Sequence, residues 1–215
     1  MKPNMEYSIS GEIAQYVRLV VPRNEGVWAS NGAIVAQDDG ITWKLRVPGG
    51  AAGAIRRSLS GEGLSLTRIK SSRDGAAVVL AANAPGHILE WSLENNSVLT
   101  TRGSFLSAWG PDITIDVSVA RRASAAFFGG AGLFLQKVSG TGKVLIYGSG
   151  DFKDIELATD ESLLVSTGNL AAFSQTVDYQ IQTVSGLRNV FFGKEGLFMT
   201  RLTGPGRVLL QSLKR

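Results

Sequence analysis

One apolar pattern occurs three times in this chain and limits what the chain can fold into. Its copies read G-E-G-L-S-L-T-R, G-A-G-L-F-L-Q-K and K-E-G-L-F-M-T-R, and each is followed by a glycine-containing turn and a second apolar run. The copies lie within residues 61–80, 129–146 and 193–212, and their shared leucines are Leu64, Leu133 and Leu197. Apolar residues at every second position are typical of half-buried antiparallel strands. The pattern therefore predicts a mainly β fold with three internal repeats.

A second element repeats between the copies of the first. It lies within residues 26–47, 97–117 and 162–181, and its shared glycines are Gly32, Gly103 and Gly168. Each copy ends in an alternating strand, at 41–47, 113–117 and 177–181. No linker rich in proline, serine or charge separates the copies. We therefore expect one domain over residues 1–215, with pseudo-threefold symmetry and an N-terminal part that completes the C-terminal unit.

Glycines between the apolar runs predict tight hairpin turns at Ser139–Gly142 and Thr203–Gly206, because glycine tolerates positive φ. The first of these turns resembles a fragment of a phosphate-binding loop. Such a loop needs an earlier glycine, a Ser or Thr after the lysine and a following helix. Here Lys137 and Val144 occupy the two key positions and a strand follows, which favours the hairpin. Short helical turns are expected at 53–59 and 187–192.

Composition excludes several classes of protein. The chain has no cysteine, so disulfide scaffolds and thiolate metal sites are excluded. The net charge of +4 is mild and spread along the sequence. The first residues contain no apolar signal-peptide core, and no apolar run reaches the roughly 18 residues needed to span a bilayer. These features predict a cytoplasmic protein without a transmembrane segment.

Catalytic constellations are also missing from the sequence. His87 is the single histidine, follows a Pro-Gly pair and is expected in a surface turn without a metal or catalytic partner. Glu62 and Glu195 occupy equivalent positions, but a glycosidase needs two facing acids at a controlled distance. We therefore expect no enzyme activity, no cofactor and no metal site.

A cation recurs at one position of the first element, as Arg68, Lys137 and Arg201. Each lies four residues after the repeated leucine, on the same side of its strand. Three such cations could converge on an anion or a nucleic-acid phosphate. The alternative is that each side chain extends out of the rim of the core and keeps its charge in water. The sequence favours this second interpretation.

Three stretches together resemble one family. They are the G-E-G-L-x-L-x-[RK] element, the S-L-L-V-x-x-G-x-L-A-A element and the closing E-G-L-F-M-T-R-L-T-G-P-G-R-V-L-L-Q-S. The chain resembles the mitochondrial-biogenesis family named for altered inheritance of mitochondria, over about residues 5–212. The resemblance implies a fold similar to the tryptophan RNA-binding attenuation protein, an antiparallel double-stranded β-helix or sandwich. It implies no catalytic residues, and the basic repeats of the attenuation protein have no match here.

Two functional hypotheses remain. The first is a non-enzymatic β-rich scaffold that binds an unknown protein partner and forms homo-oligomers, because many strand edges must be covered. The alternative is a protein that binds RNA or another anionic ligand through Arg68, Lys137 and Arg201. We favour the scaffold.

Overall fold

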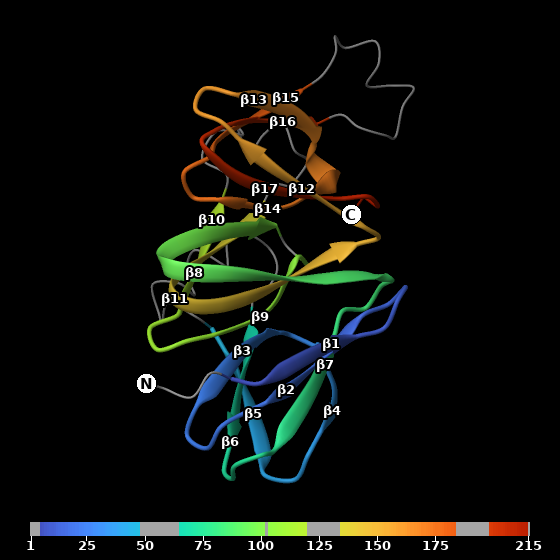
Figure 1. Cartoon of the computed structure of the whole chain (residues 1–215), viewed down its shortest axis with the longest axis vertical. Helices are drawn as coiled ribbons and strands as arrows, with labels where there is room; N and C mark the ends of the chain where they lie inside the picture. The colour runs from blue at the N-terminus through green and yellow to red at the C-terminus, as the bar shows by residue number, and fades with distance from the viewer. Residues whose placement is uncertain (1–4, 48–64, 102, 120–133, 184–197, 215) are drawn as a thin grey trace.

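The computed structural model of the chain describes residues 5–47, 65–101, 103–119, 134–183 and 198–214 (Figure 1). Within these residues the fold is mainly antiparallel β, as the alternating apolar pattern predicts. A short 3-10 turn, η1 (Thr167–Asn169), precedes β14. The strands are β1 (Tyr7–Ser10), β2 (Tyr16–Val20), β3 (Gly26–Ser30), β4 (Ile34–Gln37), β5 (Ile41–Arg46), β6 (Leu66–Ser71), β7 (Ala77–Ala81), β8 (Gly86–Thr101), β9 (Phe105–Trp109), β10 (Thr114–Val119), β11 (Phe134–Ser149), β12 (Phe152–Leu157), β13 (Ser162–Ser166), β14 (Leu170–Ser174), β15 (Asp178–Thr183), β16 (Phe198–Thr203) and β17 (Gly206–Gln211).

The strands follow one another along the long axis of the molecule as three units (Figure 1). The N-terminal unit contains β1 to β7, the middle unit β8 to β11, and the C-terminal unit β12 to β17. The described strands form three sheets, and the largest runs through all three units. Their orders are β1-β2-β7-β4, then β12-β17-β14-β8-β11-β9-β3-β6-β5 with β10 beside β11, and finally β13-β16-β15.

The three units pair their strands in the same order. In the N-terminal unit, β7 lies between β2 and β4, and β6 lies between β3 and β5. In the C-terminal unit, β17 lies between β12 and β14, and β16 lies between β13 and β15. In the middle unit the two 16-residue strands β8 and β11 serve both sets, since different halves of β11 pair with β9 and with β10. The structure thus shows a repeated pairing scheme, but it does not show a threefold axis.

Three register shifts support this equivalence of strands. One residue is left out of the pairing in β4, in β9 and in β14, where each strand runs beside its central partner. The unpaired residues are Val35, Leu106 and Ala171. Their spacings along the chain equal those of the repeated glycines of the second element. A bulge at one fixed position bends each strand at the same place.

The predicted hairpins are wrong. Ser139–Gly142 lies inside the continuous strand β11, where the register shifts between Gly140 and Gly142. Thr203–Gly206 joins β16 to β17, but these strands belong to different sheets and do not pair with each other. The second set of glycines therefore leads the chain from one sheet to the next, whereas the first lies at a bulge within one sheet. In both cases each apolar run finds its partners elsewhere in the sequence.

Each unit contributes most of one hydrophobic cluster. The N-terminal cluster contains fully buried residues such as Val17, Leu19 and Leu80. The middle cluster includes Val144 and Ile146, and the third cluster, mostly in the C-terminal unit, is built around residues such as Phe173, Leu202 and Val208. In β2, β7 and β16 these side chains alternate with more exposed residues, which explains the period-two pattern there. In β11, β14 and β17 consecutive residues are buried, because these strands lie inside the largest sheet and are covered on both faces.

Neighbouring units are joined by strand pairing. β3 of the N-terminal unit pairs with β9 of the middle unit, and β8 of the middle unit pairs with β14 of the C-terminal unit. The expected helical turns, together with Glu62 and Glu195, lie outside the described residues. In the part of the chain that the structure describes, no helix is long and apolar enough to cross a membrane.

Candidate functional site

The most distinctive surface lies on the outer face of β3, β6 and β5. In these antiparallel strands Arg68 is opposite Trp28 on one side and opposite Lys44 on the other. Lys70 is likewise opposite Thr42, and Arg46 continues the row on β5. Residues at every second position share one face of a sheet, so the register places four cations on the same face.

This face carries an open groove of about 600 Å³. Its lining residues are Trp28, Thr42, Trp43, Lys44, Arg46, Val47, Arg68 and Lys70. We call this site the β5–β6 groove. Half of its lining residues are cations and two are tryptophans, and no carboxylate of the described residues lines it. Such a combination favours a ligand that carries several negative charges.

Arg68 is held in place by its neighbours. Its guanidinium carbon lies 4.8 Å from the centroid of the Trp28 ring, a cation–π contact. A Cβ atom on Gly26 would lie 2.5 Å from the Arg68 guanidinium, so the absence of a side chain there makes room for it. Partial burial lowers the pKa of Arg68 from its ordinary value, and the carboxylate of Glu25 opposes this shift. The arginine remains charged and is fixed in position.

The other three cations of the groove are exposed. Lys44, Arg46 and Lys70 form no ion pair with any residue that the structure describes. Elsewhere in the chain Lys143 binds Glu90 at 2.8 Å and Arg207 binds Asp154 at 2.6 Å. The charges of the groove are therefore available for a ligand.

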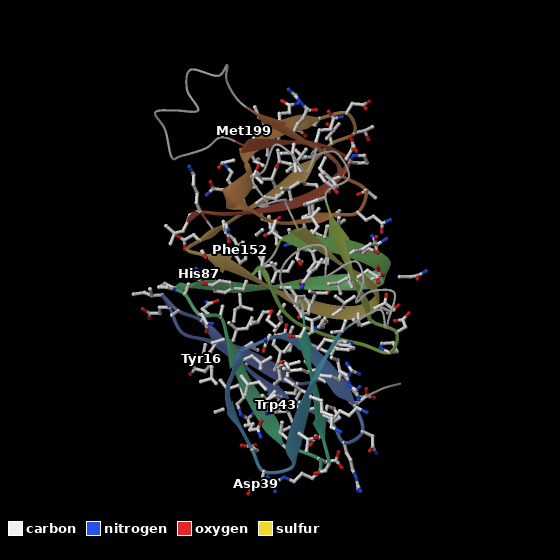
Figure 2. All side chains as sticks on the ribbon, turned by 180° about the vertical axis from the view of Figure 1, so that it is seen from behind. Tyr16, Asp39, Trp43, His87, Phe152 and Met199 are labelled. Carbon is white, nitrogen blue, oxygen red and sulfur yellow. The ribbon has the colours of Figure 1, made fainter. Side chains whose placement is uncertain are left out.

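Trp43 also lines the groove, but it is opposite Ile69 in the register, so its side chain leaves the other face of β5 from Lys44 and Arg46. Its side chain is 50% exposed on β5, in the N-terminal unit (Figure 2). Exposed indoles at the rim of a basic groove can stack on nucleic-acid bases.

The three cations that the sequence singles out do not form one site. Arg68 lies on β6, Lys137 on β11 and Arg201 on β16, each on the central strand of a three-strand set. β6 and β16 lie at opposite ends of the long axis (Figure 1). Met199, two residues before Arg201, is accordingly far from Trp43 in Figure 2. The three cations do not converge, because equivalent strands belong to units that follow one another along the axis.

The neighbours of these cations also differ between units. Lys137 is half buried opposite Leu99 and Asp116, whereas Arg201 is exposed opposite Leu164 and Gln180. Only Arg68, among the three, has cations opposite and diagonal to it across the strand pair. Of the predicted positions, the groove therefore contains Arg68 alone.

His87 is not an isolated turn residue. It lies near the start of β8, where its Nδ1 is 2.8 Å from the carbonyl oxygen of Gly150 and 3.3 Å from a carboxylate oxygen of Asp151. Asp151 is 83% exposed. Among the described residues, no group of three or more histidine, cysteine or acidic side chains is placed to hold a metal ion.

Sequence reasoning missed Lys44, Arg46 and Lys70. The signal was present, since T-W-K-L-R and T-R-I-K alternate basic and apolar residues. Knowing that 41–46 pairs with 66–71, and in which register, was necessary to bring the two rows together. A period-two pattern cannot supply a register between strands that are distant in sequence.

The fold and the groove together define an all-β protein of repeated sheet units with a basic, tryptophan-bearing surface. The chain belongs to the family described as Mitochondrial biogenesis AIM24, whose model matches residues 7–213. This confirms the family that the sequence motifs indicate.

Two similar proteins come from Streptococcus pyogenes. An uncharacterised protein of serotype M6 is 28% identical over 206 residues, which cover 92% of this chain and 81% of that protein. The crystal structure of a protein from the same species superposes with a TM-score of 0.80 and 24% identity, covering 98% of this chain and 94% of the other. The second similarity shows that the fold is shared.

Proposed function

We propose that this chain is a non-enzymatic binding protein whose β5–β6 groove binds single-stranded nucleic acid. The observation that carries the proposal is the row of four cations on one face of β5 and β6, none ion-paired within the described residues, in a groove that two tryptophans also line. A basic groove with an exposed aromatic is the usual means of binding single strands without sequence preference.

The residues of the groove would contact different parts of the nucleic acid. Lys44, Arg46 and Lys70 are exposed and would neutralise phosphates, each as a flexible charge. Trp43 would stack on a base. Arg68 is half buried against Trp28 and would supply a fixed guanidinium for a phosphate oxygen.

Binding of labelled single-stranded RNA, followed by fluorescence anisotropy, tests this proposal. Affinity should fall with salt, with a slope of roughly −0.7 per phosphate contact, hence about −2 to −3 for three or four contacts. The triple variant Lys44→Ala, Arg46→Ala, Lys70→Ala should bind at least tenfold more weakly. Unchanged affinity in this variant would remove the proposal.

A matched control uses Arg18 and Lys153. Both are exposed cations on other strands, and neither lines the groove. The double variant Arg18→Ala, Lys153→Ala changes the net charge by two, so it measures the effect of overall charge. If it weakens RNA binding as much per charge as the triple variant does, binding is diffuse and the groove is not the site.

The scaffold function is a second candidate, favoured by the open strand edges at both ends of the molecule. Other parts of the proposal rest on the sequence: the absence of a reaction and of a cofactor, the cytoplasmic location and the pseudo-threefold relation of the units. A fold similar to the tryptophan RNA-binding attenuation protein belongs with them, and a shared fold alone carries no function to this chain. We expect RNA that is incubated with the protein for a long time to stay bound and uncleaved.

A further inference from the structure

Two strands at opposite ends of the molecule have a free edge. β4 is the last strand of the sheet β1-β2-β7-β4, and β13 is the first strand of the sheet β13-β16-β15. Among the described residues, no strand pairs with the second edge of either. Their equivalents in the other units are all paired on both sides. The free edges therefore mark places where the repeated pairing stops.

The pairing between units follows one register. At the first junction, Trp28 is opposite Ala108 and Ala29 is opposite Ser107. Moving each strand to its equivalent in the next unit, by the spacings of the repeated glycines, predicts the second junction. The observed second junction agrees, since Leu99 is opposite Phe173 and Thr100 is opposite Ala172.

Moving both strands by one further unit, and returning from the last unit to the first, predicts a third junction. It would place Leu164 of β13 opposite Gln37 of β4, and Val165 opposite Ala36. These strands lie at opposite ends of the long axis, so they cannot meet within one chain (Figure 1). They can meet between two copies of the chain.

Equivalent apolar side chains are buried at the internal junctions and exposed at the two ends of the molecule. The bulge residues Leu106 and Ala171 are 1% and 0% exposed at the two internal junctions. Their equivalent on β4, Val35, is 65% exposed. On the other side of the junction, Leu99 is 8% exposed and its equivalent Leu164 is 42% exposed. Apolar side chains that are buried between units are therefore uncovered at the two ends.

A hydrogen bond from a hydroxyl group to a backbone carbonyl also occurs at the equivalent place in both junctions. Ser30 donates a hydrogen bond to the carbonyl oxygen of Phe105 across the first junction. Thr101 donates to the carbonyl oxygen of Leu170 across the second, at 2.9 Å. The next residue in this series is Ser166, whose hydroxyl has no hydrogen-bond partner among the described residues. Its counterpart acceptor would be the carbonyl oxygen of Ile34.

We propose that copies of this chain assemble head to tail, with β13 of one copy pairing with β4 of the next. Leu164 packs beside Gln37 of the neighbouring copy, Val35 becomes buried, and Ser166 donates its hydrogen bond to Ile34. The interface joins two different surfaces, so repetition gives a closed ring or an open chain. It covers the edges of β4 and β13, which otherwise invite uncontrolled pairing.

The first test is the molar mass of the full-length chain by light scattering after size exclusion. We expect a multiple of 22.8 kDa. A single-chain mass at the highest soluble concentration would overturn the proposal. Leu164→Lys and Val35→Lys should each shift the mass to that of one chain, because an unpaired charge would be buried.

The matched control is Leu45→Lys. Leu45 is 52% exposed on the edge strand β5, which takes no part in the proposed interface. This variant should assemble like the wild type. Circular dichroism checks that all three variants are folded, which is expected because each replaced side chain is already exposed. Disassembly by the control as well as by the interface variants would overturn the proposal.

The second test uses the absence of cysteine from the chain. Gln37→Cys and Leu164→Cys are made in separate chains, mixed and oxidised. Opposite residues on antiparallel strands lie within the reach of a disulfide. We expect a covalent dimer from the mixture in a larger yield than from either variant alone, and none above that background from Leu45→Cys mixed with Leu164→Cys. Equal yields in the two mixtures would overturn the predicted register.

Discussion

The guanidinium of Arg68 lies over the indole ring of Trp28, and the space it occupies exists because residue 26 is glycine. The three residues lie on paired strands, β3 and β6, so the contact depends on the register of that pair. A cation–π contact in a partly buried site contributes about 1 kcal/mol. This contact fixes the position of Arg68, whereas the other three cations of the groove are exposed and can adjust to a ligand.

Gly26→Ala should therefore weaken ligand binding with little loss of stability. The added Cβ would lie 2.5 Å from the Arg68 guanidinium, which is the end of a flexible side chain and can move. We expect the melting temperature to change by only a few degrees, and the affinity for single-stranded RNA to fall about threefold to tenfold. Anisotropy and thermal denaturation of the same preparation measure both. Wild-type affinity would show that the position of Arg68 does not matter.

The fold class could be read from the sequence because its signal is local. Alternation at every second position needs only one strand, and it located β5, β10 and β15 to within two residues at their ends. The hairpins failed because a turn glycine shows that the chain bends, but not which strand it then pairs with. β16 and β17 are adjacent in sequence and lie in different sheets, so the partner of each comes from far along the chain.

The groove and the free edges needed the structure for the same reason. Lys44 and Arg68 are distant in sequence and become neighbours only through the register of β5 and β6. Val35 and Leu106 look equivalent in sequence, and one is exposed while the other is buried. Burial depends on whether a neighbouring unit covers the strand, and a repeat gives no information about where the series of units ends.

Arg207→Lys should lower the stability of the folded chain. Arg207 binds Asp154 through Nε and Nη2, and its guanidinium carbon lies 4.5 Å from the centroid of the Trp91 ring. Lysine keeps the charge but loses the two-point hydrogen bonding and the planar stacking. Since both partners are partly exposed, we expect a loss of about 1 kcal/mol and a drop in melting temperature of about 2–4 °C.

The control for this change is Arg18→Lys, at an exposed position on β2 that takes no part in the ion pairs of the described residues. It should change the free energy of unfolding by no more than about 0.5 kcal/mol. An equal loss in both variants would mean that the contact with Trp91 and Asp154 adds nothing.

Gly142→Ala should be far more damaging than its size suggests. Gly142 has φ +151° at the bulge of β11, and a Cβ atom there would lie 2.2 Å from the carbonyl oxygen of Trp109. The obstructing atom belongs to the backbone of β9, so the clash cannot be relieved by a side-chain rotation. We expect a loss of about 3 kcal/mol in the free energy of unfolding, measured by urea denaturation.

Gly32→Ala distinguishes the cost of backbone strain from the cost of a steric clash. Gly32 also has positive φ, +76°, but nothing lies within 4 Å of the position of its Cβ. The variant should therefore lose only the cost of a left-handed backbone with a side chain, about 1 kcal/mol. If both glycine variants lose the same amount, the contact between β11 and β9 is not what makes Gly142 necessary.

Thr101→Val and Ser166→Ala should differ in how their effects depend on protein concentration. Thr101 is 7% exposed, and its hydroxyl donates to the carbonyl oxygen of Leu170 inside one chain. Its removal takes away a buried hydrogen bond within one chain, so stability should fall by about 1–2 kcal/mol at every protein concentration. Ser166 would make the equivalent bond between copies, and its removal should therefore weaken assembly and leave the unfolding of the dissociated chain unchanged. Urea denaturation and light scattering over a dilution series measure the two effects, and a Ser166→Ala variant that dissociates no more readily than the wild type would contradict the bond to Ile34.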